Sequence, residues 1–301
     1  MVKKVLITGA NGNLGQRLIR RLAADFLILA VVRSEHAKSN LMSVIADLSG
    51  VEVQIVDYND ESTLADIAKN CTYAFHLVGV IKASRENTYE NAHQGPCRAL
   101  SIAAPQTNLE SIVYLSLLGS DINAANACLA SRGEAEHILM KGAVPAIVVR
   151  IPMVLGENDY ASRSLRKKSG LVFDFRSSSK EQPIYAGDVI EAMVQAMTIT
   201  VSEIIELAGP ESLTRALLIR RATGILGKHP IVISLPLAMG MLIAKLLEWI
   251  LPVSPVTQDM MGILDHDDDI DAAKGSSHLG IQLTSLDDTL RKVVSDPSSS
   301  A

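Results

Sequence analysis

The sequence predicts an α/β fold of the Rossmann type: a doubly wound parallel sheet with a smaller C-terminal α/β lobe. Two observations carry this prediction. Short, continuous apolar runs alternate with helical patterns, and the first run ends in a glycine-rich turn. A parallel sheet that is buried on both faces needs unbroken apolar strands, and right-handed crossovers then place helices on both faces. The expected strands are Lys4–Thr8, Phe26–Val32, Val51–Val56, Tyr73–Val80, Ser111–Leu117 and Ala146–Ile151, and the main helices between them are Asn13–Ala24, Ser62–Lys69, Tyr89–Ala104 and Leu129–Lys141.

Composition narrows the class of protein. The chain has 301 residues, 48% of them hydrophobic and 20% charged, with a net charge of −5. These values are typical of globular proteins. Basic and acidic residues are mixed along the chain, which argues against a nucleic-acid partner. The cysteines Cys71, Cys97 and Cys128 show no paired spacing, so we expect neither a disulfide framework nor a metal site. The first strand begins within a few residues of Met1, so no leader is expected and the cytoplasm is the predicted location.

The turn after the first strand predicts a dinucleotide site. It reads Thr8-Gly9-Ala10-Asn11-Gly12-Asn13-Leu14-Gly15. In this pattern Gly9 permits the tight turn, Gly12 clears space for a pyrophosphate, and Gly15 lets the next helix approach the sheet. Backbone amides at the positive end of that helix then face the phosphates. An ordinary strand–helix turn is the alternative, but the motif lies in the first strand–helix–strand unit, as dinucleotide binding requires.

The end of the second strand favours NADP(H), with NAD(H) as the alternative. An acidic residue there would bind the ribose diol of NAD, whereas this chain has Arg33 and Ser34. A guanidinium and a hydroxyl suit a 2′-phosphate. Asp57, after the third strand, is placed to accept a hydrogen bond from the adenine amino group. A solvated arginine and a simple turn aspartate are the competing interpretations.

These motifs resemble the extended and atypical short-chain dehydrogenase/reductase superfamily, whose members are similar to NAD(P)-dependent epimerases and dehydratases. The nearest subgroup resembles the NAD(P)H-binding accessory subunit of respiratory complex I. The resemblance spans about residues 3–295 and implies that the cofactor is also lined by Asn11, Asn13, Leu14, Tyr58, Leu77, Val78, Gly79, Arg132 and Pro152. The matching segments are Gly9-x-x-Gly12-x-x-Gly15, Asp57-Tyr58, Phe75–Gly79, Asn91-x-x-x-Gly95, Val113–Ser116, Arg150–Pro152, Pro183–Val189 and Glu206–Glu211.

The sequence departs from this superfamily at its chemistry. Active members carry Tyr-x-x-x-Lys on the helix after the fifth strand, where Cys128 and Arg132 stand here. Arginine can still bind ribose hydroxyls, but a thiol does not replace a tyrosine as a proton relay. Cys128 is therefore either a small buried filler or a reactive thiol, and Ser116 is a further candidate at the end of the fifth strand. Other candidates, each with a structural alternative, are Ser120, Tyr185, Tyr89 and His93.

We expect two domains: residues 1–152 bind the dinucleotide, and residues 153–301 form a substrate or partner lobe. Residues 184–200 are expected to return to the first domain. The lobe carries six basic residues between 161 and 180, which fit an anionic substrate, acidic lipid head groups or a solvated loop. The acidic run 265–271 lacks the glycine and distal glutamate of a calcium loop and predicts a solvated turn.

An apolar stretch at residues 235–251 is nearly long enough to span a bilayer. Lys245, Glu248 and the boundary prolines argue against a span and favour a buried or lid helix. An interfacial helix with Trp249 at the boundary, or a partner-docking surface, is the alternative.

Three functions remain open at this point. The first is an NADP(H)-binding protein whose cofactor is structural or sensory and serves a partner. The second is an active oxidoreductase or epimerase with an altered proton donor and an unassigned small-molecule substrate. The third is a membrane-peripheral protein that handles a lipid or a quinone-like molecule.

Overall fold

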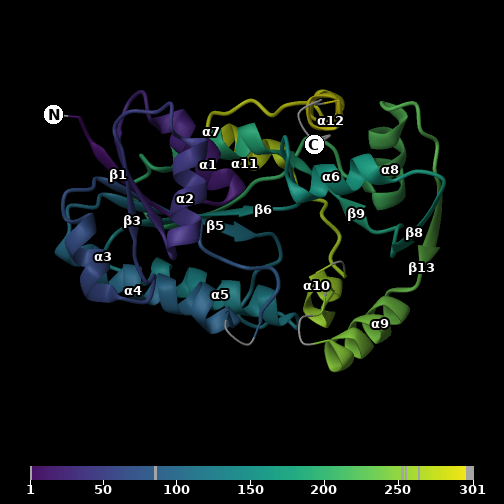
Figure 1. The fold of residues 1–301 in the computed structure, drawn as a ribbon, viewed down its shortest axis with the longest axis horizontal. Coiled ribbons are helices and arrows are strands. Elements are labelled where there is room, and N and C mark those ends of the chain that lie inside the picture. Colours follow the sequence, from purple (N-terminus) through teal and green to yellow (C-terminus); the bar gives the residue numbers. More distant parts are fainter. Residues whose placement is uncertain (1, 85–86, 252–253, 255, 264, 296–301) are drawn as a thin grey trace. The chain divides into compact units, whose positions relative to one another are not determined.

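The centre of the fold is a seven-stranded parallel sheet, which confirms the predicted Rossmann-type α/β class (Figure 1). In the computed structural model, residues 2–84, 87–251, 254, 256–263 and 265–295 are described. The chain divides into two units: Met1–Arg150 with Ile190–Ile205, and Ile151–Val189 with Glu206–Ala301. The sheet belongs to the first unit. Its strands, in spatial order, are β11 (Glu203–Glu206), β6 (Ala146–Ile151), β5 (Ser111–Leu117), β4 (Tyr73–His76), β1 (Lys4–Thr8), β2 (Leu27–Val32) and β3 (Val51–Ile55).

The strand order reverses at β1. From β1 the chain moves outward to β2 and β3, and then crosses back to β4 on the other side of β1. Loops that leave the carboxyl ends of β1 and β4 therefore diverge to opposite faces, which is where open α/β sheets bind their ligands. Parallel pairing aligns Thr8 with Val31 on one side and with His76 on the other.

Helices cover both faces of this sheet. Figure 1 shows α3, α4 and α5 side by side on one face and α1 and α2 on the other. The apolar face of α1 is buried because Leu18, Ile19 and Leu22 recur at helical spacing. The helical segments of the first unit are α1 (Asn13–Leu22), α2 (Glu35–Val44), α3 (Glu61–Ala68), the π-helix η1 (Glu90–Gln94), α4 (Gly95–Ala103), the 3₁₀ turn η2 (Ala104–Gln106) and α5 (Ala127–Met140).

One predicted helix differs in detail. The segment expected as a single helix over Tyr89–Ala104 begins with the π-helical turn η1 before α4. The wider turn brings His93 inward, where its side chain is fully buried. Such π-turns are uncommon and often lie at functional sites.

The second unit contains three two-stranded sheets and a small helical core. Its strands pair as β10 with β7, β12 with β9, and β13 with β8. The core is formed by residues such as Leu165, Leu218, Ile219, Leu290 and Val293. Its elements are β7 (Val154–Leu155), α6 (Tyr160–Lys167), β8 (Leu171–Phe175), β9 (Lys180–Glu181), β10 (Ile184–Tyr185), α7 (Ala186–Ala196, which passes into the first unit), β12 (Leu213–Thr214), α8 (Arg215–Gly224), β13 (Ile231–Leu235), α9 (Leu237–Ile250), α10 (Gln258–Ile263), α11 (Ala272–His278) and α12 (Leu286–Val294).

The apolar stretch at 235–251 is not a buried helix, so that part of the prediction is wrong. It forms α9, in which only Gly240 and Ala244 are buried. The large apolar side chains of α9 are exposed instead, including Trp249 at 84%. Among the described residues, no helix has both the length and the apolar character needed to cross a membrane.

Candidate functional site

The glycine turn between β1 and α1 leaves a bare backbone surface. Gly9 has φ +72°, and a β-carbon there would lie 2.9 Å from the carbonyl carbon of Leu77. A β-carbon at Gly15 would lie 2.7 Å from the oxygen of Ala10, so only glycine lets α1 start this close to the turn. Gly12 is exposed, and a β-carbon there would have only the Gly9 oxygen, at 3.3 Å, within contact range. The outer side of the turn is therefore clear of protein atoms.

The N-terminus of α1 is suited to an anion. Gly12 is its N-cap, no side chain caps the first turn, and no acidic residue lies in that turn. Asn11 and Asn13 are exposed beside it, and Leu14 is half-buried. The Asn13 side chain accepts a hydrogen bond from Arg17 Nε at 2.9 Å. The first amides and the positive end of the helix dipole thus face outward, as phosphate binding requires.

Tyr58 supports this turn from within the fold. Its hydroxyl accepts a hydrogen bond from the Gly9 amide at 3.1 Å and donates one to the carbonyl of Val31 at 3.1 Å. Burial raises the pKa of the Tyr58 phenol to about 12, so it stays protonated. Tyr58, expected from the family resemblance to line the cofactor, therefore ties the turn to the end of β2.

Arg33, Ser34 and Asp57 follow the ends of two neighbouring strands, β2 and β3. Arg33 is exposed, and its Nη1 donates to Asn87 Oδ1 at 3.2 Å. Ser34 caps α2 by accepting a hydrogen bond from the Ala37 amide at 3.2 Å. Asp57 is exposed and accepts a hydrogen bond from the Asn59 amide at 3.0 Å. A guanidinium, rather than a carboxylate, thus follows β2 directly.

The loop after β4 lies beside the glycine turn. The Leu77 amide donates to the carbonyl of Thr8 at 3.1 Å, which extends the pairing of β4 with β1. Leu77 and Val78 are half-buried, and Gly79 is exposed. The predicted cofactor residues of β1 and β4 therefore meet at the point where the strand order reverses.

Arg132 lies against this loop. Its guanidinium occupies the space that a β-carbon at Gly79 would need. Nη1 donates to the carbonyl of Leu115 at 3.0 Å and lies 3.5 Å from the hydroxyl of Tyr114. The side chain is buried, and Nε has no hydrogen-bond partner within the described part of the chain. The buried guanidinium therefore has an N–H group that could donate a hydrogen bond to a polar ligand at Gly79.

Cys128 contacts the same loop one residue further on. Its Sγ lies 3.6 Å from the carbonyl oxygen of Val80, and the side chain is fully buried. Asn126 caps the first turn of α5 by accepting hydrogen bonds from the Cys128 and Leu129 amides. Cys128 and Arg132 are one helical turn apart, so both side chains reach the loop from α5. The structure thus brings Cys128 and Arg132 together against the loop after β4.

His93 fixes the loop from the other side. Its Nε2 lies 3.1 Å from the amide nitrogen and 3.0 Å from the carbonyl oxygen of Val80. Its Nδ1 lies 3.1 Å from Ser131 Oγ, and its ring stacks on Tyr89 with the centroids 5.5 Å apart. Burial, with the positive charge of Arg132, lowers the pKa of His93 to about 3. His93 is therefore a neutral positioning group.

Ser116 is engaged in a buried network that the sequence did not reveal. Its hydroxyl donates to Glu136 Oε1 at 2.5 Å and lies 3.3 Å from Ser120 Oγ. Glu136 is in turn paired with Arg150, with Nη2 to Oε2 at 2.6 Å. The only hint in the sequence was an arginine inside the otherwise apolar run of β6. The Ser116 proton is thus directed to a carboxylate inside the fold.

The remaining predicted residues lie in the second unit. Pro152 is buried directly after β6. Tyr185 donates to Glu157 Oε1 at 2.6 Å, and the Lys292 ammonium lies 4.5 Å from the centre of its ring. These contacts favour a structural role for Tyr185 in its own unit.

Most of the basic residues between 161 and 180 contact acidic or carbonyl partners within the second unit. Arg166 donates to the carbonyl of Val293, and Lys168 pairs with Asp174. The acidic run 265–271 contacts Arg176 and Lys180 through Asp265, Asp267 and Asp269. Arg163 and Lys167 instead line an open hollow of about 660 Å³ on α6.

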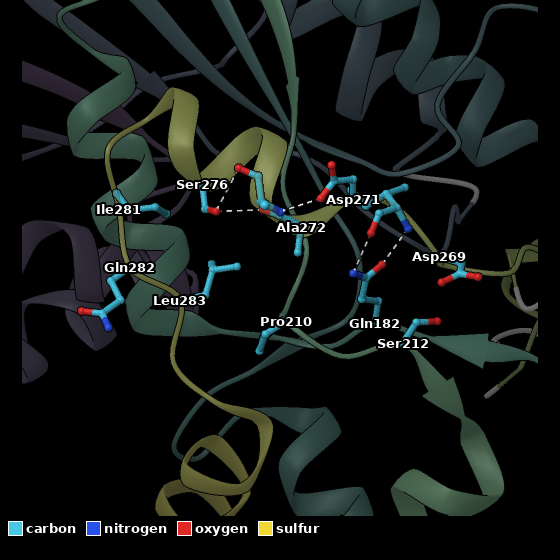
Figure 2. Close-up of a pocket in the computed structure, with 12 residues that line it drawn as sticks. Gln182, Pro210, Ser212, Asp269, Asp271, Ala272, Ser276, Ile281, Gln282 and Leu283 are labelled. Carbon is cyan, nitrogen blue, oxygen red and sulfur yellow. Dashed lines mark hydrogen bonds between the residues drawn. The ribbon is translucent and has the colours of Figure 1, made fainter.

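Another hollow, of about 590 Å³, lies beside α11 (Figure 2). The side-chain amide of Gln182, which Figure 2 labels, donates to the carbonyl of Ile270 at 3.0 Å and accepts a hydrogen bond from the Ile270 amide at 2.8 Å. Asp271 is used as the N-cap of α11. The main polar groups lining this hollow are thus already engaged in holding the unit together.

Comparison with protein families supports the interpretation of the glycine turn as a dinucleotide site. A family model described as NAD(P)H-binding matches residues 9–198. A curated relative, the ceramide reductase of Caulobacter vibrioides, is 27% identical over 238 residues. That match covers 77% of this chain and 73% of the relative.

Solved structures share the whole fold at low sequence identity. UDP-glucuronic acid 4-epimerase from Bacillus cereus, in complex with UDP-glucuronic acid and NAD, has a TM-score of 0.74 and 17% identity. It is matched over 97% of this chain and 98% of that one. The enzyme WbmG from Bordetella bronchiseptica, in complex with NAD, has a TM-score of 0.73 and 13% identity over 98% and 94% of the two chains.

Proposed function

Because the chain belongs to the NAD(P)H-binding family, we propose that it binds NADP(H) in preference to NAD(H), and that the bound dinucleotide has a structural or sensory role. A finer resemblance, to an accessory subunit of a larger redox assembly, fits a protein that holds a nucleotide for a partner. The three cysteines are buried thiols rather than disulfides. This supports a reducing compartment, and we propose the cytoplasm.

The first part of the proposal depends on the glycine turn. The exposed Gly12, the uncapped start of α1 and the absence of an acidic residue in its first turn support a pyrophosphate over Asn11–Leu14. In this arrangement Asp57 binds the adenine, and Gly79 and Arg132 bind the nicotinamide ribose. Leu77 and Val78 supply apolar contacts.

The preference for NADP(H) depends on Arg33. Its exposed guanidinium follows β2, and Ser34 is the next residue in the sequence. A 2′-phosphate would gain charge-assisted hydrogen bonds there, whereas a bare ribose diol would gain little. This arrangement supports NADP(H) as the main ligand.

The structural or sensory role depends on one observation: Cys128 is fully buried with its thiol against the carbonyl of Val80. Reduction of a carbonyl needs a hydride from the reduced nicotinamide at carbon and a proton at oxygen. At the position of the family's tyrosine this chain offers a buried thiol, and Ser116 directs its proton to Glu136. A redox sensor would then respond through differential binding of the oxidised and reduced dinucleotides.

A thermal-melting series with a turnover assay tests this role. Saturating NADPH should raise the melting temperature, and the absorbance of NADPH should stay constant in the presence of carbonyl substrates. Cys128→Ala should retain the stabilisation. If NADPH is consumed at a rate proportional to protein concentration, the structural role is contradicted.

The second candidate is a reductase that acts on a carbonyl lipid. The observation that favours it is the similarity to the ceramide reductase, which extends over both units of this chain. A ceramide-like lipid that carries a ketone, offered in detergent with NADPH, is the appropriate probe. Loss of NADPH absorbance that is abolished by Gly12→Asp but retained in Cys128→Ala would select this candidate. An epimerase would instead convert a nucleotide sugar with no net change in absorbance.

A further inference from the structure

Helix α9 buries Gly240 and Ala244 and exposes most of its large apolar side chains. Gly240 packs against Phe175 and Met261, and a β-carbon there would overlap the Met261 side chain. Ala244, one turn further on, is also fully buried. The exposed side is formed by large side chains: Met239, Leu242, Ile243, Leu246, Trp249 and Ile250. This is the reverse of an ordinary surface helix, which exposes polar residues.

The ribbon formed by β8 and β13 also exposes large apolar side chains. Its two strands are parallel, with Leu171 opposite Ile231 and Phe173 opposite Ile233. These four side chains share one face of the ribbon and are all exposed, Phe173 by 59%. Val172 and Val232 alternate with them. Val172 is buried, and Val232 packs against the core of the unit.

The ribbon and the helix adjoin each other. Pro236 alone separates the end of β13 from the start of α9, and Figure 1 shows the helix following the strand directly. Phe175, at the end of β8, lies against Gly240 of α9. We call the exposed side chains of these elements the apolar surface: Leu171, Phe173, Ile231, Ile233, Leu242, Ile243, Leu246, Trp249 and Ile250. Contiguous exposed apolar area of this kind marks an interaction site.

Basic side chains outnumber acidic ones in the segments that form the apolar surface. Residues 160–180 and 225–251 contain eight lysines and arginines and two acidic residues, Asp174 and Glu248. Two of the basic residues, Arg176 and Lys180, are paired with aspartates of the acidic run 265–271. Asp174 is buried between Lys168 and Arg215. Arg163 and Lys167 line the open hollow on α6 together with Tyr160, whose side chain is 80% exposed. The Lys228 ammonium contacts the Arg166 carbonyl, which holds α6 beside the start of β13.

We propose that the apolar surface docks on an anionic lipid bilayer, with the α6 basic residues at the head groups. At 14 residues, α9 is about 21 Å long, too short to span a bilayer. Large aliphatic residues with a terminal Trp and flanking basic side chains are the composition of helices that lie in the interface. A protein partner would account for the exposed apolar side chains. An anionic membrane accounts for both the exposed apolar side chains and the basic residues of α6. This inference stands independently of the proposed role of the dinucleotide.

Trp249 makes the test direct, because it is the only tryptophan in the chain. The full-length protein is titrated with vesicles of phosphatidylcholine containing 30% phosphatidylglycerol (a composition of about physiological anionic content). Docking predicts a blue shift of the tryptophan emission and quenching by lipids brominated near the head of the acyl chain. Pure phosphatidylcholine vesicles should bind at least fivefold more weakly.

Matched variants separate docking from general hydrophobicity. Leu246→Glu and Phe173→Glu should each weaken vesicle binding at least tenfold, because each places a carboxylate in the interface. Ile102→Glu changes an equally exposed apolar residue of α4 in the other unit and should leave binding unchanged. Arg163→Glu with Lys167→Glu should remove the preference for anionic vesicles. NADPH binding measured on every variant reports whether the first unit is folded, and it separates failure of docking from failure of the cofactor proposal.

Two results would overturn the inference. One is an unchanged Trp249 emission at saturating anionic lipid. The other is self-association of the wild-type chain, seen by sedimentation, that Leu246→Glu abolishes while vesicle binding is absent. That outcome would assign the apolar surface to a second copy of the chain.

Discussion

The guanidinium of Arg132 fills the position that a side chain at Gly79 would take. Arg132 is held there by the carbonyl of Leu115 at 3.0 Å and leaves Nε without a partner in the described part of the chain. Arg132 thus places a positive charge beside the loop after β4.

Substitution of Gly79 tests this relationship. Gly79→Ala should force the guanidinium to move, lowering the free energy of unfolding by about 1–3 kcal/mol and weakening NADPH binding. Chemical unfolding and calorimetry measure the two effects. Gly224→Ala is the control, because a β-carbon at this last residue of α8 meets no atom within 4 Å. It should be neutral or slightly stabilising. If both variants behave alike, the close approach of Arg132 has no energetic consequence.

The buried pair of Glu136 and Arg150 should contribute strongly to stability. The Glu136 side chain is 3% exposed, and it also accepts the Ser116 hydroxyl. Glu136→Gln should destabilise the chain by about 3 kcal/mol or more, since it removes a buried charge partner. Glu90→Gln, which breaks an exposed pair with Arg98, should cost less than about 0.5 kcal/mol. Urea unfolding of both variants checks the contrast, and equal losses would contradict it.

Acid should destabilise the fold through His76 and His93. Burial, reinforced by Arg132, lowers the pKa of both histidines to about 3. Between the unfolded pKa of about 6.5 and pH 3, the unfolded chain therefore binds protons that the folded chain does not. Stability is complete above pH 6.5 and falls as the pH drops, by about 1.4 kcal/mol per pH unit for each histidine.

Comparing the pH dependence of stability of the wild type with that of a histidine variant separates the contribution of this histidine from that of other titrating groups. His93→Gln should lower stability at pH 7 but show a shallower loss between pH 6.5 and pH 4 than the wild type. His137→Gln, at an exposed position of α5, is the control. Identical slopes for the wild type and His93→Gln would mean that His93 titrates alike in the folded and unfolded states.

The cysteines should be inert in the native protein. All three are buried, and burial raises the pKa of the Cys71 thiol to about 11 and that of Cys97 further. A thiol reagent should therefore label none of them until the chain unfolds. Cys128→Ala should leave the affinity for NADPH within about twofold, or about 0.4 kcal/mol. Rapid labelling of Cys128 in the native state would instead support a reactive role.

The fold class and the dinucleotide turn were predictable because their determinants are local. Apolar strand runs and glycines at fixed spacing follow directly from backbone geometry. The Glu136–Arg150 pair and the contacts of His93 with Val80 were not predictable, because they join elements that meet only in the assembled sheet. The same holds for Tyr58, whose contact with Gly9 depends on the register of β2 and β3.

Helix α9 shows a different limit of sequence reasoning. Its apolar run indicated a buried helix, since large apolar residues are usually inside. In the fold, Gly240 and Ala244 are the buried residues of the helix, and the absence of a side chain at Gly240 permits its close approach to Phe175 and Met261. Apolar residues occur on several sides of this helix. The hydrophobic pattern alone therefore could not predict which side would be exposed.

The central claim is that the glycine turn and Arg33 select NADP(H). Calorimetric titration of nucleotide-free protein with NADPH and NADH, on the wild type and on Arg33→Ala, tests it most directly. We expect NADPH to bind the wild type at least tenfold more tightly than NADH, and Arg33→Ala to remove that difference while leaving NADH binding unchanged, since a charge-assisted hydrogen bond contributes about 1.5–3 kcal/mol. Equal affinities of the wild type for NADPH and NADH, or an Arg33→Ala variant that still prefers NADPH, would contradict the account.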